Sequence, residues 1–139
     1  MDVFALTRKS NIPNNFEKYH IHNNLLIANK IKHHLAQRFP DCQWKVTNDS
    51  IYVSVKLQSS PWEKNSKIVH AIADYAYYYA DSYNYDRTDI NSDYCNMNFF
   101  GVYKNNIIAK DYAQLGTTSK TQQMELEFMR QYNEAFANE

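Results

Sequence analysis

The chain is poor in glycine, proline and cysteine, and the shortages of glycine and cysteine each exclude a class of site. Of its 139 residues, two are Gly, three are Pro and two are Cys. The two glycines, Gly101 and Gly116, cannot form the glycine-rich loops that hold phosphate groups in nucleotide-binding proteins. Cys42 and Cys95 lie outside any Cys-x-x-Cys motif and indicate reduced thiols. We therefore expect neither nucleotide hydrolysis nor a disulfide framework.

The sequence also lacks an apolar run long enough to span a bilayer. Residues 1–6 are too short and lack the basic start of a signal peptide. We therefore expect a cytoplasmic protein of a bacterial host cell with no membrane partner. A chain of this length predicts one domain, whose core needs no metal because roughly two-thirds of the unfolded surface becomes buried.

No charge of either sign is in excess, since 15 Lys and Arg stand against 15 Asp and Glu. A free nucleic-acid-binding protein usually has a basic excess, so neutrality argues against that role. The charges are unevenly distributed: residues 1–48 hold seven basic and three acidic residues (+4), and residues 49–139 hold eight and twelve (−4). This pattern predicts a molecule with a basic end and an acidic end, and the alternative is scattered, solvated charge.

Aromatic residues are abundant, with twelve Tyr and seven Phe. Tyrosine gives a large contact area for few rotatable bonds, which suits binding surfaces. We therefore expect an aromatic core and some tyrosines on the surface.

The first half of the chain predicts a helix and then a hairpin. Asn23 or Asn24 begins a helix that Pro40 ends. Apolar residues at helical spacing give this helix one buried stripe, formed by Ala28, Ile31, Leu35 and Phe39. Two alternating segments, residues 43–47 and 50–57, then predict paired strands.

The second helix is predicted from a capping box at residues 60–63. It begins at Ser60 or shortly after and extends to about Tyr83. Its buried stripe consists of Ile68, Ile72, Tyr75, Ala76, Tyr79 and Tyr83, and Tyr77 and Tyr78 lie off this stripe.

The last part predicts a strand at residues 98–103, a short strand at 107–109 and a helix at 120–136. A capping box of Ser119 and Gln122 begins that helix. The whole pattern predicts an α+β fold in the order α-β-β-α-β-(β)-α, with helices on one face of a small antiparallel or mixed sheet. Residues 1–23 form an N-terminal arm, and residues 24–139 form the domain.

Residues 82–100 combine carboxylates, amides and aromatic rings more densely than any other stretch. We interpret this connector and the preceding tyrosines as a protein-binding surface, because Tyr and Arg dominate interface hot spots. The alternative for the tyrosines is core packing. The candidate partner-binding residues are Tyr77, Tyr78, Tyr85, Asp86, Arg87, Asp89, Asp93 and Tyr94.

The sequence offers only weak indications of a metal or catalytic site. His33 and His34 are adjacent, so on a helix they diverge and cannot share a metal. The Asp-x-Asn-x-Asp start of a calcium loop at Asp89 lacks the required Gly and final Glu. Cys95 with His70 has the chemistry of a nucleophile and a base, but no spacing forces the two together. We expect no enzyme activity, no metal and no cofactor.

Two motifs resemble one of the large polyvalent-protein-associated domains of phages and conjugative elements. They are Phe-Pro followed by Trp-Lys-Val at residues 39–46, and Tyr-Asn-Tyr-Asp with Asp-Tyr and Asn-Phe-Phe within residues 83–100. The likeness covers roughly residues 24–104. Thr88 and Cys95 depart from the pattern, where Ser and an aromatic residue are expected. The resemblance implies a mobile-element origin and no catalytic residue.

From the resemblance and the connector we predict an accessory protein that inhibits a host defence protein, of anti-CRISPR or anti-restriction type, by non-catalytic binding. The partner would be a host protein such as a CRISPR effector, and the chain a monomer or homodimer. The alternative is a single-stranded nucleic-acid-binding module that uses the first helix. Its candidate residues are Lys30, Lys32 and Arg38.

Overall fold

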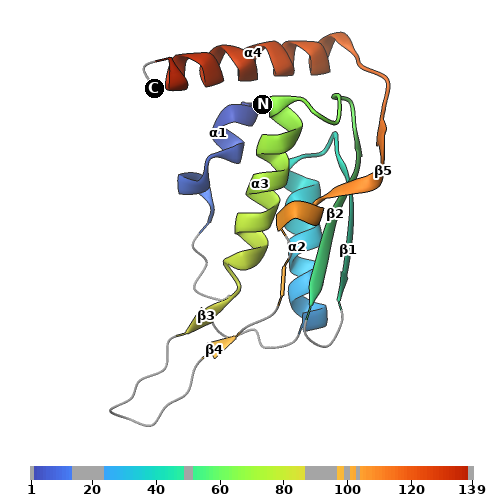
Figure 1. Ribbon diagram of the computed structural model, residues 1–139, viewed down its shortest axis with the longest axis vertical. Coiled ribbons are helices and arrows are strands. Elements are labelled where there is room, and N and C mark those ends of the chain that lie inside the picture. Colours follow the sequence, from blue (N-terminus) through green and yellow to red (C-terminus); the bar gives the residue numbers. More distant parts are fainter. Residues whose placement is uncertain are drawn as a thin grey trace.

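The computed structural model describes residues 2–13, 24–48, 52–86, 97–98, 101–102 and 104–137. It has the predicted α+β class, with α2 and α3 beside a three-stranded sheet and α4 across one end of α3 (Figure 1). The elements are α1 Val3–Thr7, η1 Lys9–Asn11, α2 Asn24–Arg38, β1 Gln43–Asn48, β2 Val53–Ser60, α3 Lys67–Asp81, β3 Tyr85–Asp86, β4 Met97–Asn98, η4 Lys104–Asn106, β5 Ile108–Gln114 and α4 Ser119–Phe136.

The main sheet has the order β1-β2-β5 and is mixed. β1 and β2 form the predicted antiparallel hairpin, with Val46 opposite Val55 and Lys45 opposite Lys56. β5 runs parallel to β2. Parallel strands need a long crossover, and the connection between β2 and β5 contains α3.

Both long central helices pack on one face of the sheet, as predicted. α2 contacts β1 and α3 contacts β2. β2 alternates accordingly, with Val53, Val55 and Leu57 buried between partly exposed polar residues. Full burial of each such side chain contributes about 1.5–3 kcal/mol.

The predicted helical stripes are confirmed. Every member of the α2 stripe is buried, and so is every member of the α3 stripe. α3 also buries Val69 and Ala73, so more than one of its sides is covered. α1 packs against α3 and α4 and places Val3 in the core.

The capping box predicted at Ser60 is wrong. Ser60 is the last residue of β2, and α3 begins at Lys67 with Ser66 as its N-cap. The Ser60 hydroxyl instead accepts a hydrogen bond from the backbone N–H of Trp62 at 3.1 Å. The Trp62 indole is buried and donates to the Thr121 carbonyl of α4 at 2.9 Å, so tertiary packing overrides the local signal.

Two further boundaries differ from the prediction. The third strand of the main sheet extends from Ile108 to Gln114, where the sequence predicted only residues 107–109. Backbone hydrogen bonds to β2 hold it, including Leu115 N–H to the Ser60 carbonyl at 2.7 Å. α4 begins one residue earlier than predicted, and its capping box pairs Thr118 with Thr121.

Only part of the strand predicted at residues 98–103 can be compared with the structure. Asn98 belongs to β4, which pairs with β3, and Gly101 forms an isolated parallel bridge with Tyr52. Residues 99, 100 and 103 lie outside the described residues. No helix within the described ranges has the length and apolar composition of a bilayer-spanning segment.

Gly101 is required by a close approach to Tyr52, since a Cβ at this position would overlap the Tyr52 ring. Gly101→Ala should therefore lower the free energy of unfolding by about 1–3 kcal/mol. Gly116 is the matched control, because a Cβ there meets nothing. Urea denaturation of both variants checks the prediction, and equal stability of the two would contradict it.

Candidate functional site

The described part of the chain contains a hollow of about 320 Å³ where α1, α3 and α4 meet. Its aromatic lining comes from three elements that are far apart in the sequence. We call this site the aromatic groove. Its rings are Phe4, Tyr78, Phe128, Tyr132 and Phe136.

The rings on α1 and α4 form a row that leads from the core to the surface. Phe4 and Phe128 pack edge to face with centroids 5.8 Å apart. Phe128 then lies 6.0 Å from Tyr132, and Tyr132 lies 4.7 Å from Phe136. Phe128 is 1% exposed and Phe136 is 36% exposed. The groove is therefore anchored in the core at one end and accessible to solvent at the other.

Charged side chains surround the groove and already contact its rings. Lys9 Nζ lies 4.3 Å from the Tyr78 ring centroid, and the Arg8 guanidinium lies 5.2 Å from that of Phe4. Lys67 Nζ lies 4.8 Å from the Tyr132 ring centroid. Such cation–π contacts orient the cations and leave them available at the surface. Of the described residues that line the groove, Asp74 carries negative charge.

The predicted surface pair Tyr77 and Tyr78 is half-buried, with ring centroids 5.1 Å apart. Lys104 joins the pair from η4 and donates a hydrogen bond to the Tyr78 hydroxyl at 3.1 Å. This hydrogen bond raises the pKa of Lys104, so its ammonium group stays charged. Tyr78 therefore combines an apolar ring in the groove with a polar tip held by a cation.

The other predicted partner-binding residues are not among the described residues that line the aromatic groove. Tyr85 and Asp86 form β3, whose backbone pairs with β4 at the base of the connector. Arg87, Asp89, Asp93 and Tyr94 lie outside the described residues. Their role in binding stays a prediction.

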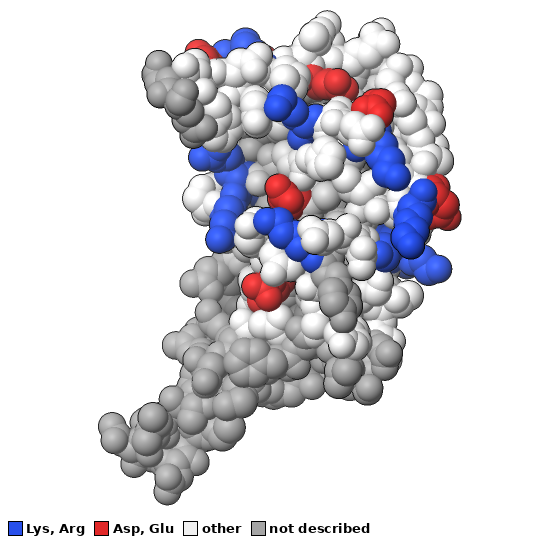
Figure 2. Space-filling model, viewed as in Figure 1, with Lys and Arg blue, Asp and Glu red and all other residues white. Residues whose placement is uncertain are grey.

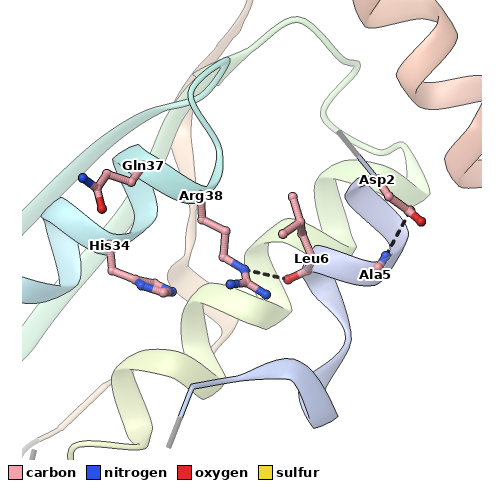
Figure 3. Close-up of a pocket in the computed structure, with 6 residues that line it drawn as sticks. All are labelled: Asp2, Ala5, Leu6, His34, Gln37 and Arg38. Atoms are coloured by element: carbon pink, nitrogen blue, oxygen red, sulfur yellow. Dashed lines mark hydrogen bonds between the residues drawn. The ribbon is translucent and has the colours of Figure 1, made fainter. Parts of the chain in front are cut away.

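A second hollow, of about 420 Å³, lies between α1 and α2 and is lined by Asp2, Ala5, Leu6, His34, Gln37 and Arg38 (Figure 3). Arg38 donates to the Leu6 carbonyl at 3.0 Å and stacks over the Tyr75 ring at 4.6 Å. It is therefore held by internal contacts. Lys30 and Lys32 are instead exposed on α2, so the three predicted nucleic-acid-binding residues differ in their exposure and contacts.

His34, which lines this second hollow, also joins α2 to α3. Its ring stacks on Tyr79 with centroids 3.8 Å apart, and its Nε2 lies 2.7 Å from the Tyr75 hydroxyl. The Tyr79 hydroxyl lies 3.0 Å from that of Tyr83. Stacking and hydrogen bonding make this cluster a helix–helix contact.

The described residues offer little nucleophilic or metal-binding chemistry. Burial, with a smaller contribution from the nearby Asp41, raises the pKa of the Cys42 thiol to about 12, so the reactive thiolate is suppressed. Cys95 lies outside the described residues. Within the described ranges no three His, Cys, Asp or Glu side chains gather in a way that could hold a metal ion.

Sequence reasoning missed Phe4, Lys9 and Lys104 as members of the site. Phe136 ends the helix predicted at residues 120–136, but it was not assigned to a binding surface. The repeat of Phe128, Tyr132 and Phe136 on α4 was a usable signal, because a stripe that continues beyond the core leaves its last ring exposed. Nothing local indicated that α1 would complete the groove.

The buried tyrosine cluster predicts a loss of stability at high pH. Burial raises the pKa of Tyr75 to about 12, while the Arg38 charge opposes this effect. The neutral phenol therefore stabilises the fold below the unfolded pKa of about 10, and this stabilisation is lost as the pH rises to about 12. Urea denaturation should show a decline of at most about 1.4 kcal/mol per pH unit from Tyr75. Tyr75→Phe should flatten this decline, and an unchanged slope would contradict the assignment.

Comparisons of the chain with protein-family models, with curated proteins and with solved structures find no match. The resemblance to the polyvalent-protein-associated domain stays a prediction from the motifs quoted above.

Proposed function

We propose that this chain is an accessory protein of a phage or other mobile element, and that it inhibits a host defence protein by binding it. The aromatic groove carries the proposal. The resemblance at residues 24–104 supports the mobile-element origin. In this proposal the protein acts in the bacterial cytoplasm, as a monomer or homodimer, on a CRISPR effector or a restriction enzyme.

The groove has the composition of an interface hot spot. Aromatic residues are enriched at the centres of protein interfaces, and polar residues form the rim. Here Phe136 and Tyr78 provide partly accessible rings, while Lys9 and Lys104 stand beside them. A hollow of about 320 Å³ suits an apolar side chain from a partner.

The rim charges indicate what the partner would present. Arg8 and Lys9 stand against Asp74 among the charged residues that line the groove. A carboxylate next to an aromatic or aliphatic anchor would complement this rim. We therefore propose that the partner inserts an apolar side chain flanked by an acidic residue.

The binding mode is proposed to be non-catalytic. Arg8 and Lys9 beside the groove contact its rings, and Lys104 donates a hydrogen bond to the Tyr78 hydroxyl. Binding alone can inhibit an enzyme when it covers the site that the substrate needs. This mode requires shape and charge complementarity and no reacting group.

Phe136→Ser tests the groove, because this ring is 36% exposed and its loss should leave the fold intact. Removal of a hot-spot ring should weaken partner binding by about 2 kcal/mol, roughly 30-fold in Kd. The measurement is transformation by a targeted plasmid in strains that carry a CRISPR or restriction system. Wild type should restore transformation and Phe136→Ser should not.

Leu126→Ser is the matched control. Leu126 also lies on α4 and is 64% exposed, but it does not line the groove. It should keep the inhibitory activity. Equal activity of the two variants would remove the groove from the proposal, and failure of the wild type in every such strain would overturn the proposed function.

The connector is tested separately with Asp89→Ala/Tyr94→Ala. If the connector adds to the interface, this double variant should recover less of the defence protein in affinity purification than the wild type. Since interface rings and charges contribute unequally, a several-fold loss is expected. Equal recovery would restrict the interface to the groove.

A further inference from the structure

The face of the sheet that is turned away from α2 and α3 carries a cluster of lysines. Lys45 on β1, Lys56 on β2 and Lys110 on β5 line a hollow of about 610 Å³. We call this site the lysine face. Lys45 and Lys110 are exposed and Lys56 is half-buried. Figure 2 shows Lys and Arg side chains along the side of the molecule where the sheet lies, and others on the opposite side near α1.

The strand register brings two of these lysines directly opposite each other. Lys45 pairs with Lys56 across the antiparallel hairpin. Like charges at directly opposed positions destabilise a sheet. The hydrogen bond from Lys56 Nζ to the Asn106 carbonyl holds this ammonium group at the hollow. Burial lowers the pKa of Lys56, and the nearby Lys110 lowers it further, as expected for cations that converge.

Repulsion of this kind is relieved when an anion binds between the cations. Of the charged residues that line the hollow, three are Lys and one is Asp111, a net charge of +2. The chain therefore has a local basic patch although its total charge is neutral. This basic patch was not among the sites expected from the sequence.

We propose that the lysine face binds the phosphate backbone of double-stranded nucleic acid. Thr47, Ser54 and Gln58 line the hollow beside the lysines and can donate hydrogen bonds to phosphate oxygens. The described lining contains no aromatic ring on which an unpaired base could stack, which favours a duplex over a single strand. It also contains no Arg, so the contact carries no bidentate readout of bases.

This site is separate from the aromatic groove and does not depend on the proposed function. The groove is formed by α1, α3 and α4, and the lysine face by the three strands and η4. One copy of the chain could hold a defence protein at one surface and duplex DNA at the other. Such a double contact would suit a partner that itself works on DNA.

The test is fluorescence anisotropy of a short labelled DNA duplex with the full chain. Three lysine–phosphate contacts predict a slope of log K against log salt of about −2.7. Affinity should lie in the range of sequence-independent binding, with Kd about 10⁻⁴ to 10⁻⁶ M. Lys45→Gln/Lys56→Gln should reduce the slope by about 1.8, which corresponds to binding roughly 200-fold weaker at about 50 mM salt.

Lys64→Gln/Lys120→Gln is the matched control, because it removes the same charge from exposed positions that do not line the hollow. It should leave duplex binding nearly unchanged. Lys45→Gln/Lys56→Gln removes a repulsive pair and also the hydrogen bond from Lys56 to the Asn106 carbonyl, so its melting temperature should change little. Phe136→Ser should also bind the duplex normally, which separates this test from that of the proposed function.

Three results would overturn the proposal. The first is a wild type that does not bind the duplex at about 50 mM salt. The second is an equal loss of binding in the two lysine double variants, which would mean that total charge alone matters. The third is stronger binding to a single-stranded oligonucleotide or to polyglutamate than to the duplex, which would assign the face to another class of ligand.

Discussion

Because α3 is buried on more than one side, it determines where the aromatic groove lies relative to α2 and the sheet. Towards α2 it places Tyr75 and Tyr79, which meet His34 through a hydrogen bond and a stacked ring. Towards α1 and α4 it places Ala71 and Tyr78, which line the aromatic groove. Because α3 packs against β2 and also against α1 and α4, it determines how far the groove lies from the sheet.

The two candidate surfaces differ in their chemistry because they differ in their elements. Helices supply the groove, and on α4 a stripe of large aromatic side chains continues beyond the buried core. Strands supply the lysine face, where alternation sends every second residue away from the helices. Lys45 and Lys56 follow from that alternation together with the register of the hairpin. A neutral chain can thus present an aromatic surface and a basic surface at once.

Much of the fold was predictable from periodicity. The stripes of α2, α3 and α4 repeat at helical spacing, and those of α2 and α3 are buried as expected. The β1–β2 hairpin was predictable from alternation. The error at Ser60 has a specific cause, because the same residues that resemble a helix cap also form a turn after a strand. Burial of Trp62 against α4 selects the turn.

The candidate site was less predictable than the fold. Tyr77 and Tyr78 could be placed off the buried stripe, but their neighbours Lys9 and Lys104 come from distant segments. The connector at residues 82–100 was chosen for its composition, and most of it lies outside the described residues. Composition indicates which residues suit an interface, and it does not indicate which surface they share.

The local pattern of apolar residues was sufficient to establish the α+β class, the main helices and the paired strands. The reason is that the spacing of buried residues along a helix or a strand can be read from neighbouring positions in the sequence. The extent of β5, the groove between α1 and α4, and the meeting of three lysines on the sheet were decided by packing. Each of these depends on contacts between residues far apart in the chain, and a local period carries no information about such partners.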